Sequence, residues 1–208
     1  MIRLLGLILT LTCSAAFAQA PDLVTRGNGR GALACASCHG IDGAGIAQAR
    51  YPALAAMPSA YIVKQLEDFK SGTRNNTTMR EIAAGMNAQE MLAAANYYAA
   101  LPRPKGKAVQ ASASDFERGS RLSVNGAWDR DLPACFKCHG PNGTGIAPYF
   151  PPLAGQHAGY IVQQLQDWRA GRRKNDAIGL MKAVADRLND DDIRALGEYL
   201  ASLNEVKP

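Results

Sequence analysis

Two short runs of cysteine and histidine hold the side chains of this sequence that are best suited to chemistry. Each run reads Cys-x-x-Cys-His-Gly, so two thiols lie three positions apart and an imidazole follows at once. On one helical turn such thiols can add to the two vinyl groups of a single haem, while the adjacent imidazole reaches the iron. We therefore predict two covalently bound haem c groups, each with a histidine as one axial ligand. The residues are Cys35, Cys38 and His39 in the first run and Cys135, Cys138 and His139 in the second.

Three other uses of paired cysteines fit the pattern less well. A structural zinc site needs four ligands within one fold, and each run supplies three. A thioredoxin-like redox pair lies at the end of a strand in a βαβ unit, whereas this sequence has no strand-like alternation of useful length. Disulfides are common when an exported protein has an even number of cysteines, but the histidine directly after each pair favours haem.

The two runs belong to a unit that occurs twice in the chain. The second run follows the first by 100 residues, and segment 43–47 recurs at 143–147. Segment 61–69 recurs at 160–168, and a short insertion then changes the offset to 102. Tandem duplication of a unit of roughly 90 residues explains this spacing, and it predicts two similar domains.

The duplication also indicates the second axial ligand of each iron. Met181 is the only methionine of the second half, and His157, the other candidate there, matches Pro58 in the first half. Because an iron ligand should recur in both halves, we predict Met181 as the ligand and His157 as a surface or supporting residue. The first-half methionine that matches Met181 is Met79, which we predict as the ligand of the first iron.

The other first-half methionines, Met57, Met86 and Met91, are expected in the core or along the haem wall. A methionine opposite a histidine raises the reduction potential of haem relative to a second histidine. With both axial positions filled by protein, the iron is closed to oxygen and to substrates. The sequence therefore predicts an electron carrier rather than an enzyme, with no catalytic residues.

Two more pairs recur beside these ligands. Pro52 and Pro151 lie where their carbonyls can accept a hydrogen bond from the Nδ1–H group of each ligating histidine, although plain loop prolines are the alternative. Arg74 and Arg173 follow matching glycines. These arginines fit either a solvated turn or a contact with haem propionates, and the sequence leaves both readings open.

Helices are expected to position these residues. Segment 61–69 and its copy carry apolar residues at i, i+4 and i+7, the stripe of an amphipathic helix. The last helix of each half opens with a capping signature, Asn87 before Glu90 and Asn189 before Asp192. The acidic triplet 190–192 at that point is explained by the helix dipole better than by a metal site.

The ends of the two units can be placed from breakers and export signals. Arg3, an apolar run over 4–11 and a small-x-small site at 16–18 indicate a cleaved signal peptide, residues 1–20, which would also remove Cys13 and deliver the protein to the periplasm. A cluster of breakers and small residues over 102–114 places the domain boundary near 110. The predicted domains are 21–110 and 111–208.

Charge is distributed unevenly between the two units. Residues 21–110 hold ten Lys and Arg against six Asp and Glu, whereas residues 111–208 hold twelve against twelve. The basic first unit suggests oriented docking with an acidic partner. Nucleic acid is a poor alternative because no basic stripe with interleaved aromatic residues occurs. No later segment approaches the roughly 20 apolar residues of a membrane span, so only peripheral membrane association stays open.

At this level of detail the chain resembles the dihaem cytochrome c4 family over nearly its whole mature length. The resemblance rests on the two Cys-x-x-Cys-His-Gly runs, on segments 151–156 and 160–165, on Gly171-x-Arg173, and on the late methionines. It implies an all-α fold of two tandem class I cytochrome c domains, packed about a pseudo-twofold axis with haem propionate edges together. The first half departs from the family over residues 55–58.

The resemblance implies a periplasmic one-electron carrier that passes electrons from a quinol-oxidising complex towards a haem–copper terminal oxidase. The main alternative is a dihaem cytochrome subunit of a periplasmic dehydrogenase, such as flavocytochrome c sulfide dehydrogenase. A dihaem peroxidase is a third reading, but it needs one open or displaceable iron ligand, which the symmetrical Met79 and Met181 argue against.

Overall fold

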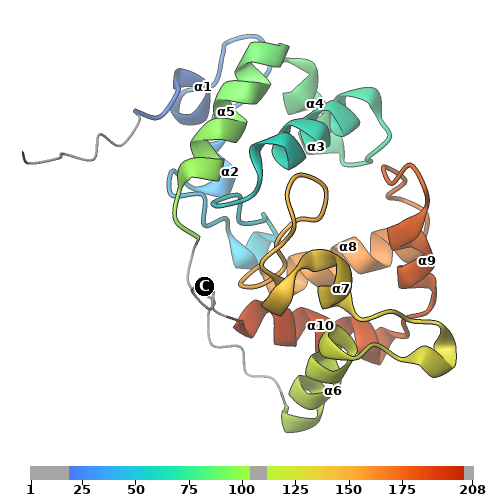
Figure 1. Cartoon of the computed structure of the whole chain (residues 1–208). Helices are drawn as coiled ribbons and strands as arrows, with labels where there is room; N and C mark the ends of the chain where they lie inside the picture. Colours follow the sequence, from blue (N-terminus) through green and yellow to red (C-terminus); the bar gives the residue numbers. More distant parts are fainter. Residues whose placement is uncertain (1–18, 104–111, 204–208) are drawn as a thin grey trace, which may run out of the picture.

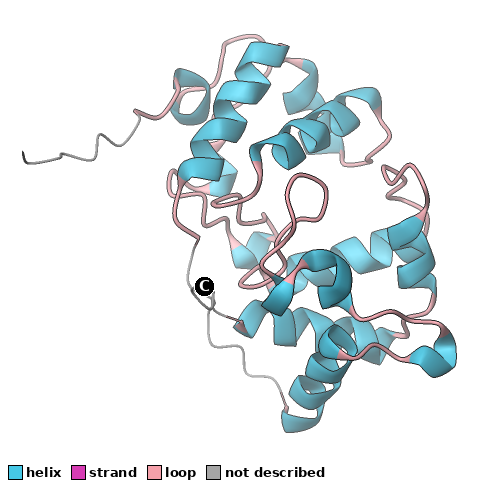
Figure 2. Ribbon diagram, in the orientation of Figure 1, coloured by secondary structure: helices cyan, strands magenta, loops and turns pink. Residues whose placement is uncertain are grey.

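The computed structural model describes residues 19–103 and 112–203, and in these segments helices and loops form the whole fold (Figure 2). Only isolated β-bridges occur there, none of them part of a strand. The predicted all-α class is therefore confirmed. Most of the predicted signal peptide and the predicted boundary near 110 lie outside the described residues. No helix in the described segments combines the length and the apolar character that crossing a bilayer requires.

The helices fall into two successive groups, which Figure 1 shows as two bodies lying against each other. The first half contains α1 (Asp22–Thr25), α2 (Ala36–His39), α3 (Ser59–Ser71), α4 (Thr77–Ala84) and α5 (Ala88–Ala100). The second half contains α6 (Ala113–Val124), α7 (Cys135–His139), α8 (Ala158–Arg169), α9 (Leu180–Asp186) and α10 (Asp190–Ser202). Short 3₁₀ turns, Ala47–Ala49, Trp128–Arg130 and Pro141–Gly143, connect them.

Each half encloses its own core, built from the predicted helical stripes. Ile62, Leu66 and Phe69 are buried along α3, and Ile161 and Trp168 are buried along α8. In the first half this stripe packs with α5, and in the second half α8 packs with α10. Two separate cores are what a duplicated unit of this size should form.

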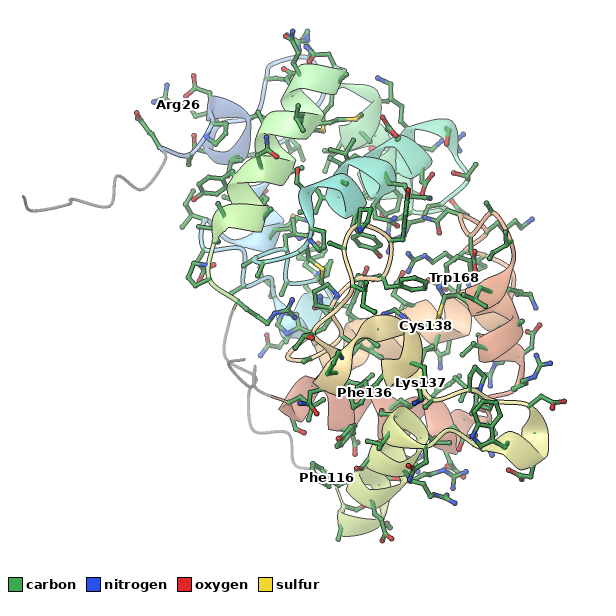
Figure 3. All side chains as sticks on the ribbon, viewed as in Figure 1. Arg26, Phe116, Phe136, Lys137, Cys138 and Trp168 are labelled. Carbon is green, nitrogen blue, oxygen red and sulfur yellow. The ribbon has the colours of Figure 1, made fainter. Side chains whose placement is uncertain are left out.

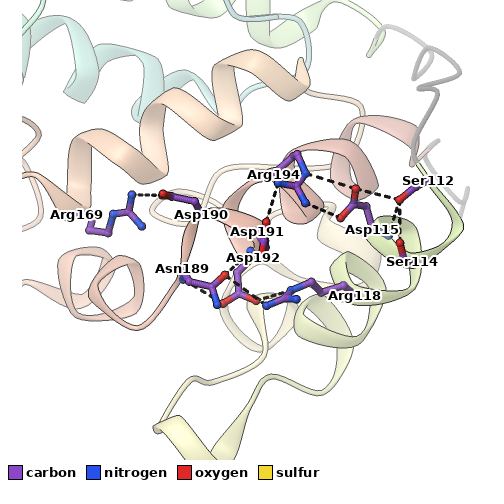
Figure 4. Close-up of polar contacts among 10 residues, drawn as sticks. All are labelled: Ser112, Ser114, Asp115, Arg118, Arg169, Asn189, Asp190, Asp191, Asp192 and Arg194. Atoms are coloured by element: carbon purple, nitrogen blue, oxygen red, sulfur yellow. Dashed lines mark hydrogen bonds and ion pairs between the residues drawn. The ribbon is translucent and has the colours of Figure 1, made fainter.

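The last helix of each half begins with the predicted capping box. The Asn87 and Asn189 side chains each accept a hydrogen bond from the backbone three residues on, and Glu90 and Asp192 bond back to the cap backbone. Asp192 also pairs with Arg118 at 2.8 Å, and Figure 4 shows this contact beside the cap. The acidic triplet thus starts a helix and fastens it to α6, as expected of a structural role.

The two halves meet along α3, α8 and the loops that follow these helices. Arg74 and Arg173, one from each half, form an isolated antiparallel bridge. Gln156 and His157 of the second half hydrogen bond to the first-half backbone at Ala53 and Ala44. The interface therefore lies next to the loops that follow the cysteine–histidine motifs.

Candidate haem sites

The first histidine is fixed by a backbone carbonyl. His39 is the last residue of α2 and is 9% exposed, and its Nδ1 lies 3.0 Å from the carbonyl oxygen of Pro52. A carbonyl oxygen can only accept, so Nδ1 carries the hydrogen and donates it. Nε2 is then left with its lone pair, which is the form that binds a metal.

The second histidine repeats this arrangement. His139 ends α7, is 8% exposed, and donates from Nδ1 to the carbonyl oxygen of Pro151 at 2.8 Å. Burial lowers the pKa of both imidazoles, and the proline carbonyls oppose that effect. Both rings are therefore held neutral in one tautomer, and the predicted role of Pro52 and Pro151 as hydrogen-bond acceptors is confirmed.

A glycine in each half allows the histidine and its carbonyl to come together. Gly45 has φ +71°, and a Cβ atom there would lie 2.6 Å from the Pro52 carbonyl oxygen. Its own N–H donates to the His39 carbonyl at 2.9 Å. Gly145 repeats the positive φ and the bond to its histidine, since its N–H donates to the His139 carbonyl. Only glycine fits so close an approach, which explains why this position recurs.

No disulfide joins the four cysteines of the motifs, so both thiols of each pair are available for attachment to haem. Burial raises the pKa of the Cys35 and Cys135 thiols to about 11. Figure 3 shows Cys138 on the same short helix as Phe136 and Lys137. Within the described segments, no three His, Cys, Asp or Glu side chains cluster as ligands of a metal ion.

The two predicted methionine ligands occupy matching positions. Met79 and Met181 each lie in the first turn of a helix, α4 and α9, and both are half-buried. Each backbone N–H is held by a side chain just before the helix, Asn76 for Met79 and Asp176 for Met181. The structure thus gives both methionines the same local support.

The other methionines of the first half belong to its core. Met57, Met86 and Met91 are 7%, 2% and 3% exposed and pack in the buried cluster of that half. Met79 alone among the four is only partly buried and packs at the edge of that cluster.

The residues around each histidine fit a haem. The donor set is one imidazole with a free Nε2 lone pair, two thiols and a thioether, as c-type attachment requires. Ile46 and Ile146, at matching positions beside the motifs, are 40% and 47% exposed. Aromatic rings flank the histidines, with centroids 6.4 Å apart for His39 and Tyr51. An apolar macrocycle would cover such side chains.

Arg74 and Arg173 do not form solvated turns. The Arg74 side chain is buried and donates to Gln65 of its own half and to Tyr160 and Gln164 of the other half. Arg173 repeats this pattern in reverse, donating to Gln164, Tyr61 and Gln65. The neighbouring Arg172 is the exposed one and pairs with Asp167.

This crossed pair places two positive charges together inside the interface. Among the described residues every hydrogen-bond acceptor of the two guanidinium groups is uncharged. Burial, and the nearby charge of Arg74, lower the pKa of Arg173. An anionic group at this point would offset both effects.

Sequence reasoning missed the residues that join the halves. The repeat places Gln65 and Gln164 in a helix but assigns them no contact. The family resemblance includes Gln156 in a segment and likewise assigns it no contact. The sequence does offer one sign of Gln65 and Gln164: the same polar residue recurs in both copies, directly before an apolar residue of the helical stripe. Nothing local distinguished Gln156, because its partners lie in the other half.

The sequence profile of the cytochrome c family matches residues 24–101 and, a second time, residues 116–204. These spans contain both histidine sites described above. The chain belongs to the cytochrome c family. Its relatives include cytochrome c4 of Pseudomonas aeruginosa, 34% identical over 97% of this chain and 98% of that protein, so it is a member of the dihaem cytochrome c4 type with two covalently bound haem c groups.

This cytochrome is also similar to proteins connected with thiosulfate oxidation. It is 43% identical to a thiosulfate dehydrogenase electron acceptor of Stutzerimonas stutzeri, over 95% of this chain and 92% of that protein. Its structure resembles a thiosulfate dehydrogenase (TsdBA) from Marichromatium purpuratum with a TM-score of 0.82 and 41% identity. The match covers 88% of this chain and 39% of that longer chain.

The solved structure of reduced cytochrome c4 from Pseudomonas stutzeri is similar as well. It matches with a TM-score of 0.76 at 34% identity, over 82% of this chain and 93% of that one. The expected fold of two tandem cytochrome c domains is therefore confirmed.

Proposed function

We propose that this cytochrome is a periplasmic one-electron carrier that accepts electrons from a thiosulfate-oxidising dehydrogenase. The observation that carries the proposal is the 43% identity to a thiosulfate dehydrogenase electron acceptor over almost the whole of both chains. This favours the dehydrogenase-linked alternative of the sequence analysis, with thiosulfate rather than sulfide as the substrate class. From this cytochrome the electrons would then pass towards a terminal oxidase.

The proposed haem residues follow the geometry of the two sites. We assign covalent attachment to the cysteine pairs and axial ligation to one histidine and one methionine in each half: Cys35, Cys38, His39 and Met79, then Cys135, Cys138, His139 and Met181. Bound haem supplies an iron that takes up and releases one electron. The protein holds each imidazole neutral and oriented through Pro52 or Pro151.

The crossed arginines are proposed to hold haem propionates at the interface. Arg74 and Arg173 bring two positive charges among uncharged partners, and carboxylates are the anions that a guanidinium group binds best. Arg173 lies near enough to His139 for its charge to help lower the pKa of that imidazole. Such a contact would also fasten the two halves.

The protein is proposed to have no catalytic site of its own. Met79 and Met181 have equal support from the helices that carry them, which leaves neither iron specialised for binding a substrate. A peroxidase would need such a difference. Periplasmic location rests on the signal peptide predicted over residues 1–20.

The test is reduction of the purified oxidised holoprotein by a thiosulfate dehydrogenase with thiosulfate as the electron source. We expect both haems to be reduced within the turnover time of the enzyme, with no reduction when either the enzyme or thiosulfate is omitted. Rapid reduction by a quinol-oxidising complex, with none by the dehydrogenase, would contradict the proposal.

That second outcome would favour the general respiratory carrier, which the cytochrome c4 relatives support. Haem staining of a denaturing gel and a pyridine haemochrome assay check the cofactor separately. Two haems per chain are expected, and one after Cys35→Ala with Cys38→Ala.

A further inference from the structure

One side chain of the second half is bonded to the peptide group that orients the first histidine. The Gln156 Oε1 atom accepts from the N–H of Ala53 at 2.9 Å, and Gln156 Nε2 donates to the carbonyl of Ala53 at 3.0 Å. The N–H of Ala53 and the carbonyl of Pro52 belong to the same peptide group. That carbonyl accepts the Nδ1–H of His39. An unbroken hydrogen-bonded chain thus runs from Gln156 through one peptide group to His39.

The chain is buried and held rigidly at both ends. Gln156 is 4% exposed and Ala53 is 5% exposed. Behind the glutamine, the backbone N–H of Gly155 donates to Leu200 of α10, which fixes its position in the second half. Beside it, the His157 ring bonds the Ala44 carbonyl at 2.9 Å, and so holds the same first-half loop. Neither end can shift without moving a helix or a haem loop.

The second half has no counterpart of this chain. The His139 imidazole donates to Pro151, but the next residue is Pro152, so that peptide group has no N–H to donate. In the duplicated register Gln156 corresponds to Met57, whose thioether cannot replace an amide. Met57 and Gln156 line the same small cavity between the halves, so the residues are placed alike and differ in chemistry.

We propose that Gln156 is a cross-domain positioning residue for the first haem, which strengthens His39 as an iron ligand and makes the two haems unequal. An amide whose N–H is bonded becomes a stronger acceptor at its carbonyl, because hydrogen bonds in a chain polarise one another. A stronger acceptor at Nδ1 gives the imidazole more basic character. More basic imidazole stabilises ferric iron and so lowers the reduction potential of the first haem.

The inference rests on the proposed ligation of the first iron by His39. It adds a direction for electron flow within the molecule, since it biases the first haem towards the lower potential. It also makes the potential of that haem depend on contact with the second half. Any movement that parts Gln156 from Ala53 would raise it.

The test compares the two haem potentials by spectroelectrochemistry in the wild-type holoprotein and in Gln156→Met, which places the first-half residue at the second-half position. We expect the reduction equilibrium of the first haem to shift towards ferrous iron by about twofold to tenfold, where tenfold is about 59 mV for one electron. The second haem should stay unchanged. The two potentials are assigned in a Met181→His background, which displaces that of the second haem.

A second variant removes the donor instead of the acceptor. Ala53→Pro reproduces Pro152 of the other half, replaces the N–H that Gln156 accepts by a ring carbon, and should raise the potential of the first haem in the same way. Pro152→Ala is the matched control, because it creates the N–H in the half where the counterpart of Gln156 is Met57, and it should leave both potentials unchanged.

Two results would overturn the inference. Equal movement of both haem potentials in Gln156→Met would show a general effect of the interface, and no movement in either Gln156→Met or Ala53→Pro would show that the peptide group transmits nothing. Both readings require two haems per chain by the pyridine haemochrome assay and a cooperative thermal unfolding transition in each variant. A wild-type protein that binds only one haem, or whose first haem lacks the spectrum of histidine–methionine ligation, would instead contradict the proposed function. The haemochrome assay and the spectrum of the wild type show this before any variant is made.

Discussion

Each histidine proposed as an axial ligand is held by a proline carbonyl 13 or 12 residues further along the chain, at Pro52 and Pro151. Covalent spacing brings the imidazole to the haem, and this carbonyl then decides which ring nitrogen carries the hydrogen. The methionine proposed as the opposite ligand has its backbone N–H bonded by a side chain before its helix, Asn76 or Asp176. A substitution of the methionine side chain should therefore change the iron ligand and leave the local backbone in place.

Met181→Ala should remove the weak long-wavelength absorption of methionine-bound ferric haem at the second site and leave that of the first. The reason is that Met181 is the proposed thioether of its half, and its helix is held independently of its side chain. Met181→His should lower the potential of the second haem, since imidazole favours ferric iron relative to a thioether. Optical spectra of the oxidised variants provide the measurement.

Met91→Leu is the matched control because Met91 is buried in the core of the first half. It should keep the long-wavelength band at full strength. Retention of a full two-haem band in Met181→Ala would show that another side chain binds the second iron.

At the scale of the elements, the second half depends on how α10 begins. Asp192 is 1% exposed, bonds back to the Asn189 backbone, and pairs with Arg118 and Arg130 at 2.8 Å each. Glu90 in the first half is bonded to the cap of α5 and to Arg30 in the same manner. The duplicated fold thus ties its last helix to its earlier segments twice, with a carboxylate each time.

Asp192→Asn should destabilise the second half by about 2 kcal/mol. A fully buried pair broken on one side costs about 3–5 kcal/mol, but both arginines here are about one-third exposed, so water screens part of the charge. Thermal or denaturant unfolding of the holoprotein measures the loss. Arg194→Gln, which removes the ion pairs of an arginine whose side chain is half exposed, is the control and should change the unfolding free energy by less than about 1 kcal/mol.

The Asp192 carboxylate should also make the unfolding free energy of the second half depend on pH. Burial acts to raise the pKa of Asp192, but the hydrogen bonds from Arg130, the Asn189 backbone and Arg118 outweigh it and lower the pKa in the folded protein. The stabilisation is therefore complete above the ordinary aspartate pKa of about 3.9 and is lost as the pH falls below it. The difference in unfolding free energy between wild type and Asp192→Asn should shrink over that range. A difference that stays constant down to pH 2 would contradict this.

At the scale of the whole molecule, the halves are joined by polar side chains that cross between them. Arg74 donates to Tyr160 and Gln164, and Arg173 donates to Tyr61 and Gln65, so each guanidinium group serves both halves. With the haem propionates held here as proposed, positive charge at this point favours ferrous over ferric iron in both haems.

Arg74→Gln should therefore lower the reduction potentials of both haems together, in contrast to the single shift expected for Gln156→Met. Under the proposed propionate contact, loss of one positive charge at the interface stabilises the ferric states of both haems. Spectroelectrochemical titration gives the measurement. Arg172→Gln is the control, because Arg172 is exposed and paired with Asp167, and it should leave both potentials in place.

The surplus positive charge of residues 21–110 bears on docking rather than on this interface. Lys64 is in part neutralised, because it bonds Asp68 and the Asn175 carbonyl of the other half. Arg26 and Arg80 are exposed and better suited to steer an acidic partner. Electron-transfer rates should fall as salt rises, since the Debye length is about 10 Å at 0.1 M.

Reversal of these two charges, Arg26→Glu with Arg80→Glu, should slow association by stopped-flow more than Lys182→Glu with Arg194→Glu. Rates that are the same at low and high salt would show that apolar contact around the haem edge governs docking instead.

The spacing of the cysteines and histidines, the duplication, the matching positions of Met79 and Met181 and the helix caps could all be predicted from the sequence. Each of these depends on covalent spacing or on periodicity within a short window, so it can be read without knowing the fold. The tertiary structure decided how the copies differ. Gln156 and Ala53 are 103 residues apart, and Arg74 and Tyr160 are 86 apart. Their contacts exist only because two cores pack against each other in one orientation, which is fixed by many non-local contacts together and by no local pattern.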